Sequence, residues 1–210
     1  MDNETKIHLS SLEMELINNS DWILTKNNIL KKTQSILERV QENVYDYAAL
    51  HRHLFPSQVM AISPKVSKGE NYKGLPWLML DYPRYFGKEG TSPDKANIFA
   101  IRTMFWWANF FSTTLHLSGI YKEEYQTAIT RHYKDLCKNE YYCCVSTDQW
   151  HHHFEKENYR RMDEFTKNEF NDFVREKPFI KLSRRFLLTE WGKAIKLLSE
   201  EFVRIAGYLG

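Results

Sequence analysis

The sequence predicts an α+β fold with a mainly antiparallel sheet, and three observations support this class. Apolar residues recur at helical spacing near both ends of the chain. The middle of the chain carries strand-like runs, of which the two longest form a hairpin over about 97–118. Aromatic residues make up 15% of the 210 residues, and aromatic rings favour sheets. We therefore expect a sheet built around this hairpin and covered by N-terminal, middle and C-terminal helices.

The N-terminal part is expected to begin with two helices. A short one runs from Leu12 to Ile17, after Ser10 and Ser11, which are typical capping residues. A longer one runs from Ile29 to Tyr47, where apolar residues follow steps of three and four. After Pro56 we expect a short strand over 58–63, a polar loop over 64–74, a strand over 75–82 that Pro83 stops, and a second loop over 87–93.

The central hairpin is expected to join 97–107 to 110–118 through a two-residue turn at Ala108 and Asn109. With that turn, Trp107 faces Phe110, and Arg102 lies on the sheet face opposite to His116. A register shift of one residue would bring both side chains to the same face, because successive residues of a strand point to opposite faces.

The chain from residue 122 onward is expected to alternate helices with short strands. Helical spacing of apolar residues predicts helices, and runs of strand-forming residues predict strands. The expected elements are a helix over 122–138, a strand over 141–146, a pairing segment over 150–154, an exposed amphipathic helix over 155–175, a short strand within 179–188 and a final helix over 190–208.

Composition narrows the class of protein. The formal net charge is +2, from 29 basic and 27 acidic residues, and this near balance argues against nucleic-acid binding. No linker rich in Gly, Pro or Ser divides the chain, so a single domain over 1–210 is expected. The chain begins without the apolar stretch of a secretory signal, which favours the cytoplasm. Three cysteines without metal-ligand spacing are interpreted as reduced thiols.

One uncharged stretch, 103–121, is about as long as a membrane span. Several Ser, Thr, Asn and His residues interrupt it, and its alternation suits strands better than a helix in lipid. We therefore expect no membrane association.

Several short strings resemble a bacterial family of unknown function, the YktB-like domains. These strings are Gly74-Leu75-Pro76, the hairpin 99–117, Ile120-Tyr121-Lys122-Glu123-Glu124-Tyr125, and a charged helix followed by a strand at 179–182 and by Phe186-Leu187. The resemblance spans most of the chain and implies an α+β sheet covered by helices. Because that family has no established activity, the resemblance implies no catalytic residues.

Four residues are predicted to form a ligand-binding site where strands leave the sheet. Tyr82 and Arg84 come at the end of one strand, and Arg102 and His116 belong to the hairpin. A buried guanidinium requires an anion or several acceptors, and strand ends commonly carry binding residues. The leading hypothesis is a non-enzymatic domain that binds a small anionic ligand or a protein here, without a cofactor. The structural alternatives are ion pairs of Arg102 with a helix carboxylate and of Arg84 with Asp81.

Two other functions are also considered. His151 and His153 would share one face of a strand and, with Asp148, could bind a metal in a hydrolase. Against this, no third ligand stands at a motif spacing. A structural homodimer that uses exposed aromatic residues is the third possibility, so the protein is expected to be a monomer or a homodimer.

Overall fold

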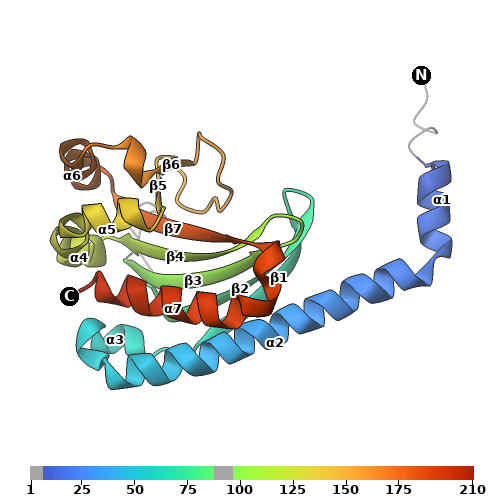
Figure 1. Ribbon diagram of the computed structural model, residues 1–210, viewed down its shortest axis with the longest axis horizontal. Coiled ribbons are helices and arrows are strands. Elements are labelled where there is room, and N and C mark those ends of the chain that lie inside the picture. The colour runs from blue at the N-terminus through green and yellow to red at the C-terminus, as the bar shows by residue number, and fades with distance from the viewer. Residues whose placement is uncertain (1–6, 88–96) are drawn as a thin grey trace.

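The computed structural model describes residues 7–87 and 97–210, and in it seven strands form one sheet. All the strand pairs are antiparallel, and the spatial order is β1-β2-β3-β4-β7-β5-β6 (Figure 1). This confirms the predicted class. The strands are β1 (Lys65–Tyr72), β2 (Leu75–Phe86), β3 (Ile98–Trp106), β4 (Phe110–Ser118), β5 (Tyr142–Cys144), β6 (Tyr159–Arg161) and β7 (Phe179–Leu187).

Helices flank the sheet, and the two longest lie along one of its faces (Figure 1). The α-helices are α1 (Ser11–Asn18), α2 (Ser20–Leu50), α3 (Ser57–Met60), α4 (Ile120–Arg131), α5 (Tyr133–Lys138), α6 (Lys167–Glu176) and α7 (Ala194–Gly207). Short 3₁₀ segments cover 52–54, 162–164 and 188–193. Within the described residues, no helix is both long enough and apolar enough to cross a membrane.

Helix α2 is longer than expected because it begins at a capping residue well before its apolar stripe. The side chain of Asn19 accepts a hydrogen bond from the backbone N–H of Asp21 and so caps the helix at Ser20. The first buried residue of α2 is Thr33, and the stripe that follows packs on α7 and β2. The predicted periodicity from Ile29 to Tyr47 therefore covers every buried residue of the helix except Ala48, and residues 20–28 extend beyond it.

The hairpin turn has three residues, and this corrects the predicted register. Trp106 pairs with Phe110, and Ala108 takes a left-handed backbone conformation with φ of 59°. Arg102 consequently pairs with Thr114, and Ala100 pairs with His116. The expectation that Arg102 and His116 lie on opposite faces was wrong, because one additional turn residue shifts the pairing by one position.

Three other expectations in the N-terminal half were wrong. The segment predicted as a loop over 64–74 is mostly strand β1, and Lys73 and Gly74 turn the chain with positive φ angles of 49° and 82°. The segment predicted as a strand over 58–63 contains the single turn α3. Strand β2 continues past Pro83 to Phe86, because a register shift between Asp81 and Arg84 accommodates the proline. Apart from Gly87, the loop expected over 87–93 lies outside the described residues.

The chain from residue 122 onward follows the prediction in part. Strand β7 and the final helix are present, and the helix over 122–138 is divided at His132. The segment 150–154 forms no strand, and the amphipathic helix is confined to α6 because β6 and a 3₁₀ turn precede it. Polar residues with local capping bonds, such as Thr166 with Glu169, set this boundary.

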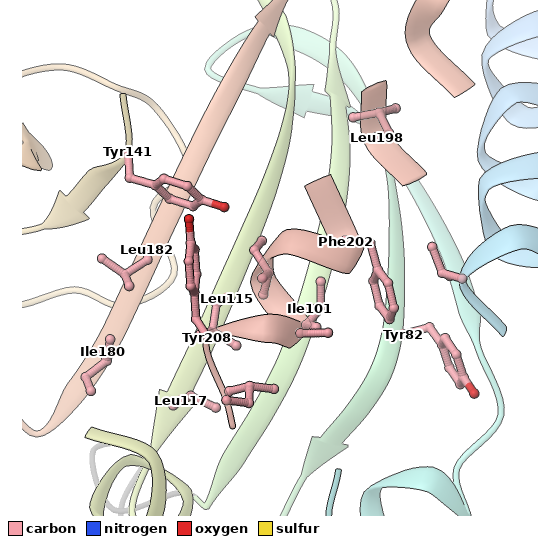
Figure 2. Packing of buried hydrophobic residues seen from close by; sticks show 14 of the residues in the cluster. Tyr82, Ile101, Leu115, Leu117, Tyr141, Ile180, Leu182, Leu198, Phe202 and Tyr208 are labelled. Carbon is pink, nitrogen blue, oxygen red and sulfur yellow. The ribbon is translucent and has the colours of Figure 1, made fainter. Parts of the chain in front are cut away.

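The main core lies between the sheet and the helices α2 and α7. Ile101, Leu115 and Leu182 are neighbours across β3, β4 and β7, and Phe202 of α7 belongs to the same cluster (Figure 2). At the hairpin end both faces are buried, since Phe105 and Phe111 belong to this core while other rings cover the second face. The aromatic excess therefore fills the interior of the protein.

Candidate ligand-binding site

The second face of the sheet carries an unusual row of buried polar residues. Asp81, Arg102, Thr114 and Ser183 stand next to one another across β2, β3, β4 and β7. Two positions further along the strands, His116 of β4 pairs directly with Lys181 of β7. The side chains of directly paired residues share a face, so these residues form one continuous polar layer.

A segment without regular secondary structure covers this layer. The cover segment, residues 145–158 between β5 and β6, is bound to the sheet by hydrogen bonds. His116 Nε2 lies 2.8 Å from Gln149 Oε1, and Lys181 Nζ donates to the backbone carbonyls of Gln149 and His151. The hydroxyl oxygen of Tyr72 accepts the backbone N–H groups of His152 and His153 at 2.7 and 3.1 Å.

A cavity of about 210 Å³ lies between the cover segment and the sheet. Arg102 supplies its charged group, and His152 together with aromatic and methionine side chains forms the rest of its wall. The lining residues are Tyr72, Trp77, Met79, Arg102, Met104, Trp150 and His152. Apolar walls with a few converging polar groups are the usual composition of a small-molecule site.

Arg102 is only partly satisfied by the protein. Its Nε donates to Asp81 Oδ1 at 2.7 Å, and only 11% of its side chain is exposed. Its guanidinium carbon lies 5.4 Å from the ring centre of Phe86 and 6.0 Å from that of Trp150. The Nη1 atom is buried and has no hydrogen-bond partner. An unpaired buried donor is costly, so this atom is suited to an anionic ligand.

The surrounding titratable groups leave Arg102 as the permanent cation of the layer. Burial, followed by the charges of Lys181 and Arg102, holds the pKa of His116 well below its usual value, and the same causes act on His152. Burial also lowers the pKa of Lys181 to about 7. Both imidazoles are therefore neutral at pH 7, when they can donate or accept hydrogen bonds.

The structure separates the four residues predicted as a site. Arg102 and His116 share the polar layer. Tyr82 is buried on the opposite face, where its ring stacks on Tyr45 of α2 at a centroid distance of 5.6 Å. Arg84 donates from Nε to the carbonyl of Ser63 at 2.9 Å, while Asp81, its expected partner, pairs with Arg102 instead.

The predicted metal ligands are also rearranged. His151 Nε2 lies 3.3 Å from Asp148 Oδ2. His153 instead comes together with Glu155 and Glu157, and within the described residues this is where three candidate ligand atoms lie within 4.8 Å of one another. Lys73 donates to Glu155 at 2.7 Å and so occupies one of these carboxylates.

Three larger hollows lie elsewhere and lack a comparable group. A hollow of 420 Å³ is lined by Arg161, Arg184 and Arg185, but Arg161 pairs with Asp163, and Arg184 pairs with Glu201. The others, of 320 and 440 Å³, flank α2. The cavity at Arg102 is distinguished by its unpaired buried donor.

Sequence patterns missed Tyr72, Trp150 and His152 as site residues. Tyr72 lies in the segment predicted as a loop, and Trp150 and His152 lie in the segment predicted as a strand. The signal that was available is the cluster of aromatic and His residues over 150–154, next to a strand pair with embedded charges.

Comparisons with known proteins add no family to this description. No protein-family model matches the chain, and no curated protein matches it significantly. The resemblance to the YktB-like domains therefore stays a prediction.

Proposed function

We propose that the protein binds a small carboxylate with an aromatic or apolar body in the cavity over Arg102, and that it performs no chemistry on this ligand. The observation that carries the proposal is Arg102, which lines an aromatic cavity and whose buried Nη1 has no hydrogen-bond partner. A carboxylate accepts hydrogen bonds from a guanidinium, and aromatic walls suit a planar apolar group.

The size of the cavity favours a small ligand over a protein partner. Ligand pockets for drug-sized molecules span about 300–1,000 Å³, whereas this cavity measures about 210 Å³. Asp81 already satisfies one side of Arg102, so a single negative charge suffices for the remaining donors. A second negative charge on the ligand would be repelled by the carboxylate of Asp81 and would have no cation to balance it.

Benzoate and its neutral analogue benzyl alcohol provide the first test. Titration followed by the indole N–H signals of Trp77 and Trp150 in NMR spectra should show saturable shifts with benzoate and at least tenfold weaker binding of benzyl alcohol. Inorganic phosphate tests whether charge alone suffices, and we expect it to bind more weakly than benzoate. Equal binding of benzyl alcohol and benzoate would refute the role of Arg102.

Two variants test the location of the site. Met104→Trp fills the cavity and keeps both residues of the Asp81–Arg102 pair, and we expect it to abolish benzoate binding. Arg102→Lys keeps the charge but loses the second donor pair, so it should weaken binding at least tenfold. Arg84→Lys is the matched control, because Arg84 bonds to Ser63 and does not line the cavity. Unchanged binding in both site variants would overturn the proposal.

The metal-assisted hydrolase is a second candidate, since His153 comes together with two carboxylates. Metal analysis of protein purified without an affinity tag tests it. Stoichiometric metal that is lost in His153→Asn but retained in His151→Asn would favour it. The absence of metal, with no stabilisation by added Zn²⁺, Mn²⁺ or Ni²⁺, would exclude it.

A cytoplasmic location is proposed as well. All three cysteines are free in the structure, which suits a reducing compartment.

A further inference from the structure

The N-terminal arm, residues 7–24, concentrates the exposed apolar surface of the protein. In the described part of the chain, nine of the sixteen exposed large apolar side chains fall within these eighteen residues. They are Ile7, Leu9, Leu12, Met14, Leu16, Ile17, Trp22, Ile23 and Leu24. Exposed apolar side chains in such density mark an interaction surface.

No residue of the arm is buried against the rest of the chain. Helix α1 contains no buried residue, and the first buried residue of α2 is Thr33. Figure 1 shows α1 and the start of α2 standing away from the sheet, with α1 turned off the axis of α2. Yet α1 is locally well specified, because Ser10 and Glu13 form a capping box. Helices this short are marginal alone in water, so a partner is needed to hold the arm in place.

The charges of the arm identify the kind of partner. Residues 7–24 contain three acidic residues and no Lys or Arg, whereas residues 25–34 contain three lysines and no acidic residue. Of these lysines, Lys26 pairs with Glu70, and Lys31 and Lys32 are exposed. An acidic arm is repelled by an anionic lipid surface and attracted by the basic segment 25–34 of another copy.

A receptive groove lies beside that basic segment. It has a volume of about 440 Å³ and is open at the surface between α2 and the hairpin end. Its walls are mainly apolar, and Lys32 is its one charged residue. The lining residues are Ile29, Lys32, Phe105, Trp107, Ala108, Leu188 and Trp191. An apolar side chain from an acidic helix fits this groove both in character and in charge.

We propose that two copies of the chain form a two-fold symmetric dimer in which the arm of each copy lies antiparallel along residues 25–34 of the other. The same pair of surfaces then meets twice, as two-fold symmetry requires. Apolar side chains of each arm enter the groove of the partner copy, and acidic residues of each arm lie beside Lys31 and Lys32. The dimer interface does not involve the cavity over Arg102, so each proposal can fail without the other.

Light scattering coupled to size exclusion, over a series of concentrations, measures the dimer directly. We expect a mass twice that of the monomer for the native chain. Glu15→Lys/Asp21→Lys reverses the arm charge and spares Glu13, which closes the capping box. Lys31→Glu/Lys32→Glu reverses the basic segment. Each variant alone should raise the dissociation constant at least tenfold.

Mixing the two variants gives the most specific result. The basic arm of the first then faces the acidic segment of the second, and the acidic arm of the second faces the native lysines of the first, so a heterodimer should form. Lys193→Glu/Lys196→Glu is the matched control for Lys31→Glu/Lys32→Glu. It makes the same change in net charge, and its two positions are exposed, one just before α7 and one within it. This control should dimerise like the native chain.

Three outcomes would overturn the dimer. They are a monomeric native chain at every concentration, a dimer that both charge reversals leave intact, and a mixture that forms no heterodimer. An anionic lipid surface is the alternative partner of the arm, and sedimentation with vesicles of anionic lipid tests it. Binding of the monomer to these vesicles would likewise overturn the proposal. Circular dichroism should show unchanged helix content in all variants, because the substituted side chains are exposed.

Discussion

Asp81 and Arg102 face each other across β2 and β3 and form a buried ion pair of 2.7 Å. Only 8% of the Asp81 side chain and 11% of the Arg102 side chain are exposed. The pair satisfies Nε of Arg102 and leaves Nη1 without a partner. Asp81 therefore fixes the guanidinium in place, while Nη1 is a buried donor that the protein does not satisfy.

Removal of one charge of this pair should be far more harmful than removal of both. Asp81→Asn leaves the guanidinium buried without its carboxylate, and we expect the free energy of unfolding to fall by about 3 kcal/mol. The double variant Asp81→Asn/Arg102→Met should recover at least half of that loss. Urea denaturation at pH 7 measures both values. A single variant as stable as the native chain would contradict the importance of the pair.

The stability of the protein should decrease in mild acid because of His116. Its pKa is held well below the ordinary value by burial, and then by Lys181 and Arg102. In the unfolded chain the imidazole takes up a proton near pH 6.5, while in the folded protein it stays neutral. Below that pH the unfolded state binds more protons, so stability falls as the pH falls, by up to about 1.4 kcal/mol per pH unit.

His116→Gln should reduce this slope between pH 6.5 and 5, as measured by urea denaturation at several pH values. His8→Gln removes one imidazole at an exposed position and serves as the control. The pKa of His152 is lowered by the same causes, so part of the slope should remain in His116→Gln. Identical slopes in the native chain and His116→Gln would argue against a neutral buried His116.

Lys181 should make the stability of the protein depend on pH in the alkaline range. Burial lowers its pKa to about 7 in the folded protein, against about 10.4 in an unfolded chain. Above pH 7 the unfolded state therefore binds more protons, and stability rises with pH. The free energy of unfolding of the native chain should therefore rise, relative to that of Lys181→Met, by about 1 kcal/mol per pH unit. Arg102 opposes protonation of the amine, whereas Cys144 and Asp148 favour it.

This comparison is best made by denaturation between pH 7 and 8.5. Burial raises the pKa of Cys143 and Cys144, so the thiols of the unfolded chain, half ionised near pH 8.5, lose their protons first, and this lowers the stability increasingly above about pH 8. The difference between the native chain and Lys181→Met cancels most of that contribution. A constant difference over the whole range would show that Lys181 keeps an ordinary pKa.

Tyr72 should control the mobility of the cover segment. Tyr72→Phe removes the hydroxyl oxygen that accepts two backbone N–H groups, from His152 and His153. One hydrogen bond contributes about 1 kcal/mol, so amide exchange of these residues should accelerate roughly fivefold or more. Hydrogen exchange followed by mass spectrometry measures this. Tyr45→Phe, on the opposite side of the sheet, should leave the cover segment unchanged.

Prediction from sequence worked best for helices and strands that pack against an apolar core. The stripe from Ile29 to Tyr47 gave the packed part of α2, and the hairpin strands were found at nearly their observed limits. It failed for β1, whose side chains are mainly polar because it is an edge strand, and for the segment 150–154. In both places the backbone conformation depends on partners that are distant in the sequence.

The sequence by itself determined the α+β class, the packed part of α2, the hairpin strands, and the presence of Arg102 and His116 within strands. Only the tertiary structure decided which of these residues meet. Trp107 joins Ala108 and Asn109 in the turn, and this one additional turn residue brings Arg102 and His116 to one face, while long-range pairing adds Asp81 and Lys181. The physical reason is that successive residues of a strand point to opposite faces of the sheet. Local composition therefore does not determine which side chains share a face, because this depends on the register and on partners distant in the sequence.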